Sequence, residues 1–117
     1  QSPFREMLVE TWNGTCPVTD TDDLAVLQAA HIKPYFGPES NVASNGFLLR
    51  ADIHLLFDRG KLVIDPDDEY TIRVCPSMGS TYSHFDRTTR LNLPKNKWAY
   101  PNKEYLRDHL NEAMNYW

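Results

Sequence analysis

The order of residue types in the first half of the chain constrains the fold more than any other feature. An apolar run, Leu24–Tyr35, precedes a loop over residues 36–44 that is rich in Gly, Pro, Ser and Asn, and Asn45-Gly46 then opens a second apolar run, Phe47–Leu49. The periodicity of the first run fits a helix or a strand, and its alanines favour a helix. The long loop and the second short run favour two extended segments, so we predict two strands.

A short helix follows the second predicted strand. The segment Ala51–Asp58 places Ile53, Leu56 and Phe57 at helical spacing, and Gly60 can end a helix just beyond it. The sequence therefore predicts the order strand, loop, strand, helix for this half of the chain.

The flanking segments add further helices and strands. We predict an opening helix over Pro3–Trp12 with Ser2 as its cap, and an extended connector over Thr15–Thr19 that leads to an acidic turn. A β-hairpin is predicted from Lys61–Asp65 and Tyr70–Cys75, because both runs alternate, are rich in β-branched residues and flank a tight acidic turn.

A closing amphipathic helix is predicted over Lys103–Tyr116, and its His109 is expected to be a surface or packing residue rather than a ligand. The core-facing side chains are predicted at helical spacing: Tyr105 or Leu106, then Leu110, Met114 and Tyr116. The predicted fold class is α+β, with a core of two strands and a short helix, an added β-hairpin and flanking N- and C-terminal helices.

The length of 117 residues indicates a single domain over residues 1–117. The chain begins with Gln1, has no leader-like segment and has no apolar run near about 18 residues, so neither secretion nor membrane spanning is predicted. We expect a C-terminal piece of a longer, cytoplasmic protein. Cys16 and Cys75 do not have the paired spacing of a structural zinc site, and we expect two buried thiols.

Charge is unevenly distributed along the chain. The formal net charge is -4, which is unusual for a protein that approaches phosphates, because nucleic-acid affinity comes largely from Lys and Arg. The stretch from Arg87 to Lys103 nevertheless contains no acid and carries Trp98 and Tyr100 among its basic residues. It is a candidate contact with a nucleic-acid backbone, and an ordinary solvated loop is an equal alternative. The candidate contact residues are Arg87, Arg90, Lys95 and Lys97.

Four polar residues are candidates for a hydrolytic centre. His54 and Asp58 lie four apart on the short helix and therefore share one face, where they can hold a divalent ion, although such a pair is more often a surface pair. His31 lies in an apolar run, where a histidine is usually a hydrogen-bonded core residue. Asn45 opens the second strand and can tie down the preceding loop, although Asn-Gly is also a common turn dipeptide.

Together, the segments CPVTD, LQAAHIKPY and SNGFLLRADIHLLFDRGKLVID resemble the HNH endonuclease family, the ββα-metal nucleases, over residues 16–65. They are most similar to the branch with A-A-H-I and L-H-x-x-F-D-R-G segments, which is common at the end of restriction and defence proteins. The resemblance implies that His31 is the general base that activates water, and that Asn45 braces the loop and orients that histidine. It also implies that His54 is a metal ligand and that Asp58, one turn on, is a second ligand.

The sequence departs from this family at the metal site. Many members have Asp or His immediately before the base, whereas this chain has Ala30. The resemblance therefore implies one divalent metal ion with few protein ligands and more waters, which favours magnesium or manganese and leaves nickel, cobalt or zinc open. The zinc-binding cysteines of other members are also missing, so packing of the flanking elements must hold the motif.

The implied function is metal-dependent hydrolysis of DNA phosphodiester bonds. Neutral His31 would take a proton from the attacking water while the cation offsets charge on the phosphate oxygens. Arg50 and Lys33 are candidate phosphate contacts, with Arg50 ranked first because it lies in the family-like segment FLLRADIH. The expected partners are double-stranded DNA and a specificity domain outside this chain, and a homodimer is left open.

Two alternatives remain at this point. An HNH-like module that binds nucleic acid without efficient cleavage is favoured by Ala30 and by the acidic net charge. A purely structural or protein-binding module would leave His31, Asn45, His54 and Asp58 together by coincidence. Sequence or modification specificity and nicking versus double-strand cleavage are not determined by these residues.

Overall fold

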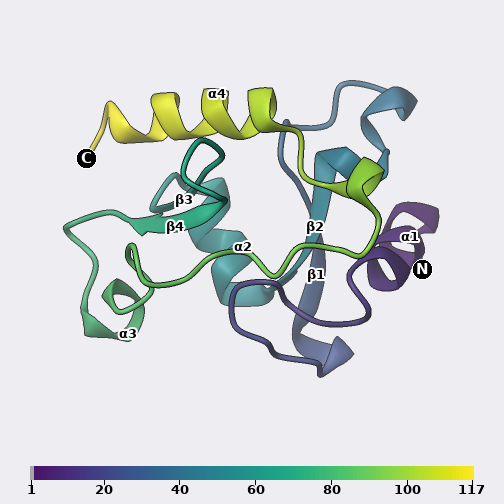
Figure 1. Ribbon diagram of the computed structural model, residues 1–117, viewed down its shortest axis with the longest axis horizontal. Coiled ribbons are helices and arrows are strands. Elements are labelled where there is room, and N and C mark those ends of the chain that lie inside the picture. The colour runs from purple at the N-terminus through teal and green to yellow at the C-terminus, as the bar shows by residue number, and fades with distance from the viewer. Residues whose placement is uncertain (1) are drawn as a thin grey trace.

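A computed structural model describes residues 2–117 of the chain (Figure 1). Its helices and strands confirm the predicted α+β fold class. The central unit consists of strand β1 (Leu27–His31), strand β2 (Gly46–Arg50) and helix α2 (Ala51–Asp58), in the predicted order. The added hairpin consists of β3 (Leu62–Asp65) and β4 (Thr71–Val74). The other elements are α1 (Pro3–Thr11), α3 (Ser80–Ser83) and α4 (Lys103–Met114), with single 3-10 turns η1 (Leu24–Val26), η2 (Pro38–Ser40), η3 (Ala43–Asn45) and η4 (Lys97–Ala99).

Strands β1 and β2 pair antiparallel and place the predicted base next to the Asn-Gly pair. Ala30 lies opposite Phe47, and His31 lies opposite Gly46. The first strand is shorter than predicted, because Leu24–Val26 forms a 3-10 turn whose Ala25 N–H is accepted by the side chain of the preceding aspartate. Residues 46–49 of β2 are buried, so this strand forms part of the core.

Helix α1 packs directly on this strand pair. Its cap is Ser2, as predicted, whose hydroxyl accepts the Arg5 backbone N–H at 3.1 Å. A Cβ atom at Gly46 would lie 2.7 Å from Phe4 Cζ and 2.9 Å from Leu8 Cδ1. The absence of a side chain at Gly46 is therefore what allows the helix to approach the strand this closely.

The segment Thr15–Thr19 is a closed turn, so the prediction of an extended connector was wrong. The Cys16 N–H donates to the Thr21 carbonyl at 2.8 Å, and the Asp20 N–H donates to the Cys16 carbonyl at 2.9 Å. Pro17 favours a turn through its fixed φ, and the buried Cys16 and Val18 anchor the turn in the core. Both cysteine thiols are free and buried, as predicted.

The β3–β4 hairpin lies beneath helix α4, which runs along one side of the molecule (Figure 1). Leu106 and Ala113 are the buried residues of this helix. The prediction that Tyr116 completes the core-facing stripe was wrong: Tyr116 is 84% exposed. The helix ends at Met114, so helical spacing no longer sets the direction of the Tyr116 side chain.

Among the described residues, no helix combines the length and the apolar character that crossing a membrane requires.

Candidate active site

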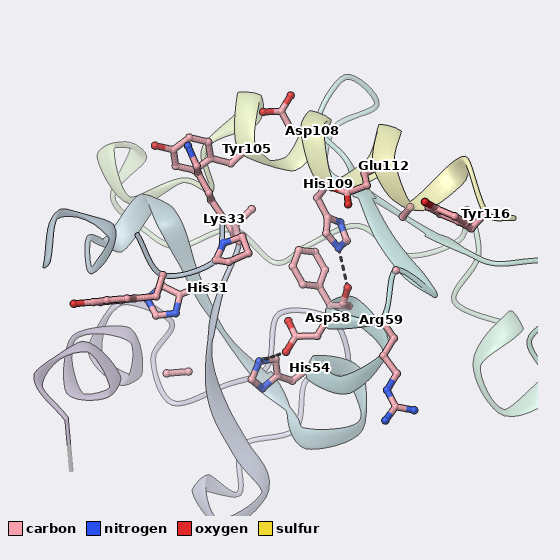
Figure 2. Close-up of a pocket in the computed structure, with 17 residues that line it drawn as sticks. His31, Lys33, His54, Asp58, Arg59, Tyr105, Asp108, His109, Glu112 and Tyr116 are labelled. Atoms are coloured by element: carbon pink, nitrogen blue, oxygen red, sulfur yellow. Dashed lines mark hydrogen bonds and ion pairs between the residues drawn. The ribbon is translucent and has the colours of Figure 1, made fainter. Parts of the chain in front are cut away.

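A cleft of about 860 Å³ lies between the end of β1, helix α2 and helix α4. His31, Lys33, His54 and Asp58 all line it (Figure 2). His31 ends β1, Lys33 follows it in the loop, and His54 and Asp58 lie on α2, so the pairing of the strands brings these residues to the same cleft. Asn45 does not line the cleft and lies fully buried behind it.

The imidazole of His31 is held on three sides. Its ring stacks on Phe4 with centroids 4.3 Å apart and planes at 10°, and Tyr35 meets it edge-on at 6.1 Å. Its Nε2 atom lies 2.8 Å from Oδ1 of Asn41. An amide oxygen only accepts hydrogen bonds, so Nε2 carries the proton and Nδ1 of the neutral ring carries the lone pair. The geometry therefore makes Nδ1 the basic atom of His31.

Asn45 ties the two ends of the β1–β2 loop together. Its Oδ1 accepts the Lys33 N–H at 2.8 Å, and its Nδ2 donates to the carbonyls of Lys33 at 3.1 Å and Ser40 at 3.0 Å. These bonds hold the loop that carries Asn41, whereas the bond to His31 itself comes from Asn41. Sequence reasoning missed Asn41, because nothing distinguishes it from the other polar residues of that loop.

His54 and Asp58 point toward one another on α2 (Figure 2). The His54 Nε2 atom lies 3.1 Å from Asp58 Oδ2, and the His54 Nδ1 atom lies 2.7 Å from Oε1 of Gln28. Because an amide oxygen only accepts, the Nδ1–H of His54 donates to Gln28. The Nε2 atom of His54 then points toward Asp58 Oδ2, and a proton or a metal ion between the two atoms makes that contact favourable.

The donors and spacing of this pair fit a divalent metal ion. Imidazole nitrogen and carboxylate oxygen bind such ions at about 2.0–2.2 Å, so two ligands at right angles lie about 3 Å apart. The 3.1 Å between His54 Nε2 and Asp58 Oδ2 matches that separation. Within residues 2–117 no group of three or more His, Cys, Asp or Glu side chains could hold a metal, so water and phosphate would complete the shell. Ala30 packs in the core, and Ala29 is the alanine that lines the cleft.

Helix α4 forms the opposite wall of the cleft and contributes Tyr105, Asp108, His109 and Glu112, which sequence reasoning did not assign to it. Tyr116, just beyond the end of the helix, also lines the cleft. His109 stacks on Phe57 with centroids 3.7 Å apart, and its Nε2–H donates to the Phe57 carbonyl at 2.8 Å. His109 is therefore a packing residue, as predicted, and it joins α4 to the last turn of α2. Burial lowers the pKa of His109, against smaller opposing effects of the Phe57 carbonyl, Asp58 and Glu112.

The two candidate phosphate contacts differ in position. Lys33 lines the cleft, with its Nζ 4.9 Å from the ring centroid of Phe36 and 5.2 Å from that of Tyr105. Arg50 lies outside the cleft and binds Asp52 with two hydrogen bonds of 2.7 and 3.0 Å. The hydrogen bond to Arg50 lowers the pKa of Asp52, and the same contact raises the pKa of Arg50. Lys33 therefore shares the cleft with His31, whereas Arg50 does not line it.

The basic stretch after α3 runs back across the molecule to the start of α4 (Figure 1). None of its residues lines the cleft. The stretch pairs with β4 through Ile72, whose N–H donates to the Thr89 carbonyl at 2.8 Å, and ends near η3, where the Asn102 N–H donates to Ser44 at 2.8 Å. Arg90 is paired with Glu69 at 2.8 Å. The exposed basic residues of the stretch are Arg87, Arg90, Lys95, Lys97 and Lys103.

Comparison with known proteins finds a matching family and a similar fold. The HNH_2 family profile, described as HNH endonuclease, matches residues 16–65. A solved structure titled modification dependent TagI restriction endonuclease has the same fold, with a TM-score of 0.69 and 21% sequence identity. That match covers 92% of this chain and 36% of the other, so this chain spans about a third of that protein's length. A search of curated protein sequences finds no match. Residues 16–65 of this chain, which contain β1, β2 and α2, are therefore the segment that matches the HNH endonuclease family.

Proposed function

We propose that this chain is the cleavage domain of a metal-dependent DNA endonuclease from a restriction or other defence protein. The observation that carries the proposal is the shared cleft: the basic Nδ1 of His31 and the facing His54 and Asp58 pair line the same opening. Phosphodiester hydrolysis needs a base and a centre of positive charge, and these residues supply the first and can hold the second.

His31 is the proposed general base. The side-chain oxygen of Asn41 accepts a hydrogen bond from the Nε2–H of His31. Nδ1 is therefore left to take the proton from a water that attacks phosphorus. The stacked Phe4 ring fixes the plane of the imidazole, so the direction of the Nδ1 lone pair is set before substrate binds. Asn45 acts one step further away, because its bonds hold the loop that carries Asn41.

His54 and Asp58 are the residues that would hold a divalent cation, which when bound offsets negative charge on the phosphate and on the leaving oxygen. An oxygen-rich shell completed by water favours magnesium or manganese, and the His54 imidazole also admits nickel, cobalt or zinc.

Lys33 is the proposed phosphate contact nearest to the chemistry. Its backbone N–H and carbonyl are both fixed by Asn45, and its ammonium lies at the cleft beside Phe36 and Tyr105. Arg87, Arg90, Lys95 and Lys97 would contact the backbone of double-stranded DNA away from the cleft, and Arg50 would act through Asp52 rather than through phosphate.

Target choice is proposed to lie outside this chain. The similar restriction endonuclease is titled modification dependent, and only 36% of its length matches. We propose that a further domain of the full-length protein selects sequence or base modification, that the protein acts in the cytoplasm, and that a homodimer would be the form that cuts both strands.

A second candidate function is nucleic-acid binding without efficient cleavage. It is favoured by the net charge of -4 and by Ala30, which packs in the core and gives the metal site no ligand.

The deciding experiment is cleavage of supercoiled plasmid by the purified chain at low salt, with magnesium, manganese, nickel, cobalt or zinc. We expect metal-dependent nicking or linearisation that is lost with chelator and in His31→Ala and His54→Ala proteins that remain folded. His84→Ala, at the exposed histidine that follows α3, is the matched control and should cleave normally. Salt-sensitive DNA binding without cleavage by any ion would overturn the nuclease proposal in favour of the second candidate.

A further inference from the structure

The exposed Gln28 side chain on β1 contacts one of the proposed metal ligands. Its Oε1 lies 2.7 Å from Nδ1 of His54, although the two residues are 26 positions apart in the sequence. We propose that Gln28 is a positioning residue that fixes the tautomer of His54 and thereby keeps Nε2 available to a metal ion. The effect of Gln28 on the tautomer of His54 can be tested by itself, whereas its value for metal binding rests on the proposed function.

The neutral His54 ring has two places for its single proton. If Nδ1 carries it, the N–H donates to Gln28 and Nε2 presents a lone pair toward Asp58. If Nε2 carries it, the N–H donates to Asp58 at 3.1 Å, and Nε2 has no lone pair left to bind a metal ion. Only the first arrangement gives a metal ion a nitrogen and an oxygen ligand side by side. Gln28 and Asp58 therefore compete for the same proton, and Gln28 favours the metal-binding arrangement.

The position of Gln28 suits this role. It lies in β1 opposite Leu49 of β2, so the strand pairing fixes its backbone. The same strand ends at His31, three residues later. One short strand therefore carries both the proposed base and the residue that orients the metal ligand. Metal-binding histidines commonly donate their second N–H to an oxygen acceptor, which fixes the ring and increases the basicity of the ligand nitrogen.

The tautomer can be measured directly on the metal-free protein. Long-range ¹H–¹⁵N NMR spectra distinguish protonated from unprotonated ring nitrogens, and His54→Gln identifies the signals of His54. At about pH 8.5, above the ordinary pKa of histidine, we expect His54 of the wild type to carry its proton on Nδ1. Gln28→Leu should move the proton toward Nε2, and Gln28→Glu, which keeps an oxygen acceptor, should not. Asn111→Leu, at an exposed amide on α4, is the matched control.

Metal affinity provides the second readout. Calorimetric titration with Mn²⁺ should show binding about tenfold weaker in Gln28→Leu than in the wild type, with Gln28→Glu and Asn111→Leu at least as tight as the wild type. A wild-type His54 protonated on Nε2, or a tautomer or Mn²⁺ affinity unaffected by Gln28→Leu, would overturn the role of Gln28. If the wild type has the Nδ1–H tautomer and that tautomer depends on Gln28, but the protein binds no Mn²⁺ and cuts no DNA, the proposed function fails and the positioning role stands.

Discussion

The imidazole of His31 stacks on the ring of Phe4, with centroids 4.3 Å apart and planes at 10°. The proposed base on β1 is therefore supported by the first helix of the chain, which lies outside the segment that matches the HNH family. Phe4 is 9% exposed and also packs against the core, so one side chain serves both the stability of the fold and the orientation of the base.

Phe4→Leu should lower the cleavage rate more than Leu8→Val does, although the two substitutions should destabilise the protein by similar amounts. Phe4→Leu keeps an apolar side chain but removes a ring contact of about 0.5–1.5 kcal/mol, and the freed His31 ring should lower the cleavage rate severalfold. Leu8→Val on the same helix is the control, since it costs a similar amount of stability, about 0.5–1.5 kcal/mol. Urea unfolding and single-turnover cleavage would be measured for both. Equal losses of rate in the two variants would show that the stack has no special role.

A side chain at Gly46 should separate α1 from the strands. Gly46→Ala places a Cβ 2.7 Å from Phe4 and 2.9 Å from Leu8, and such overpacking costs about 1–3 kcal/mol. Gly79→Ala is the matched control, because a Cβ there meets nothing within 4 Å and should change stability by less than about 0.5 kcal/mol. Thermal and urea unfolding measure both, and the prediction fails if the two substitutions have the same effect.

Substituting Asn45 should mainly destabilise the fold, whereas substituting Asn41 should mainly slow cleavage. Asn45→Ala leaves backbone groups of Lys33 and the buried Ser40 carbonyl without their partner, at about 1–3 kcal/mol for each unsatisfied group, and should destabilise the protein by at least about 2 kcal/mol. Asn41 is exposed and contacts His31, so Asn41→Ala should leave unfolding nearly unchanged and lower cleavage. Denaturant unfolding and cleavage assays test the pair. The reverse pattern would contradict these assignments.

The half-buried His109 should make stability depend on pH on the acid side of neutrality. Burial lowers its pKa below the ordinary value of 6.5, so the unfolded chain binds more protons than the folded protein between the two values. This contribution is constant above about pH 6.5, and stability decreases as pH falls from there toward the lowered pKa. His109→Gln keeps an N–H donor for the Phe57 carbonyl but does not titrate, so the difference between wild type and variant should change with pH. Urea unfolding over this range measures it, His84→Gln controls for the loss of a histidine, and a constant difference for His109→Gln would refute the prediction.

Lys33 and Arg50 should differ in the salt dependence of DNA binding. Removing one phosphate contact lowers the slope of log affinity against log salt by about 0.9, and we expect this for Lys33→Ala. Arg50→Ala should leave the slope unchanged, because its guanidinium binds Asp52, and should instead weaken the start of α2. Duplex binding in the presence of chelator, measured at several salt concentrations, tests both. A lower slope in Arg50→Ala alone would restore the order favoured by the sequence.

Local chemistry made much of the fold predictable. Apolar spacing predicted α2 with the bounds found in the structure, Ala51–Asp58, and the alternating runs predicted the β3–β4 hairpin. Errors occurred where local signals were weak or ended: Pro17 favoured a closed turn instead of an extended connector, and Tyr116 lies beyond the end of α4.

The sequence by itself determined the elements and the four polar candidates, because periodicity, turn residues and spacing are properties of neighbouring residues. Only the tertiary structure decided which side chains meet them. Asn41 rather than Asn45 bonds His31, Gln28 bonds His54, Lys33 rather than Arg50 reaches the cleft, and α4 closes it. The physical reason is that a hydrogen bond forms only when the donor and acceptor atoms are placed correctly to within a few tenths of an ångström. For residues far apart in the chain, the packing of strands and helices decides that placement.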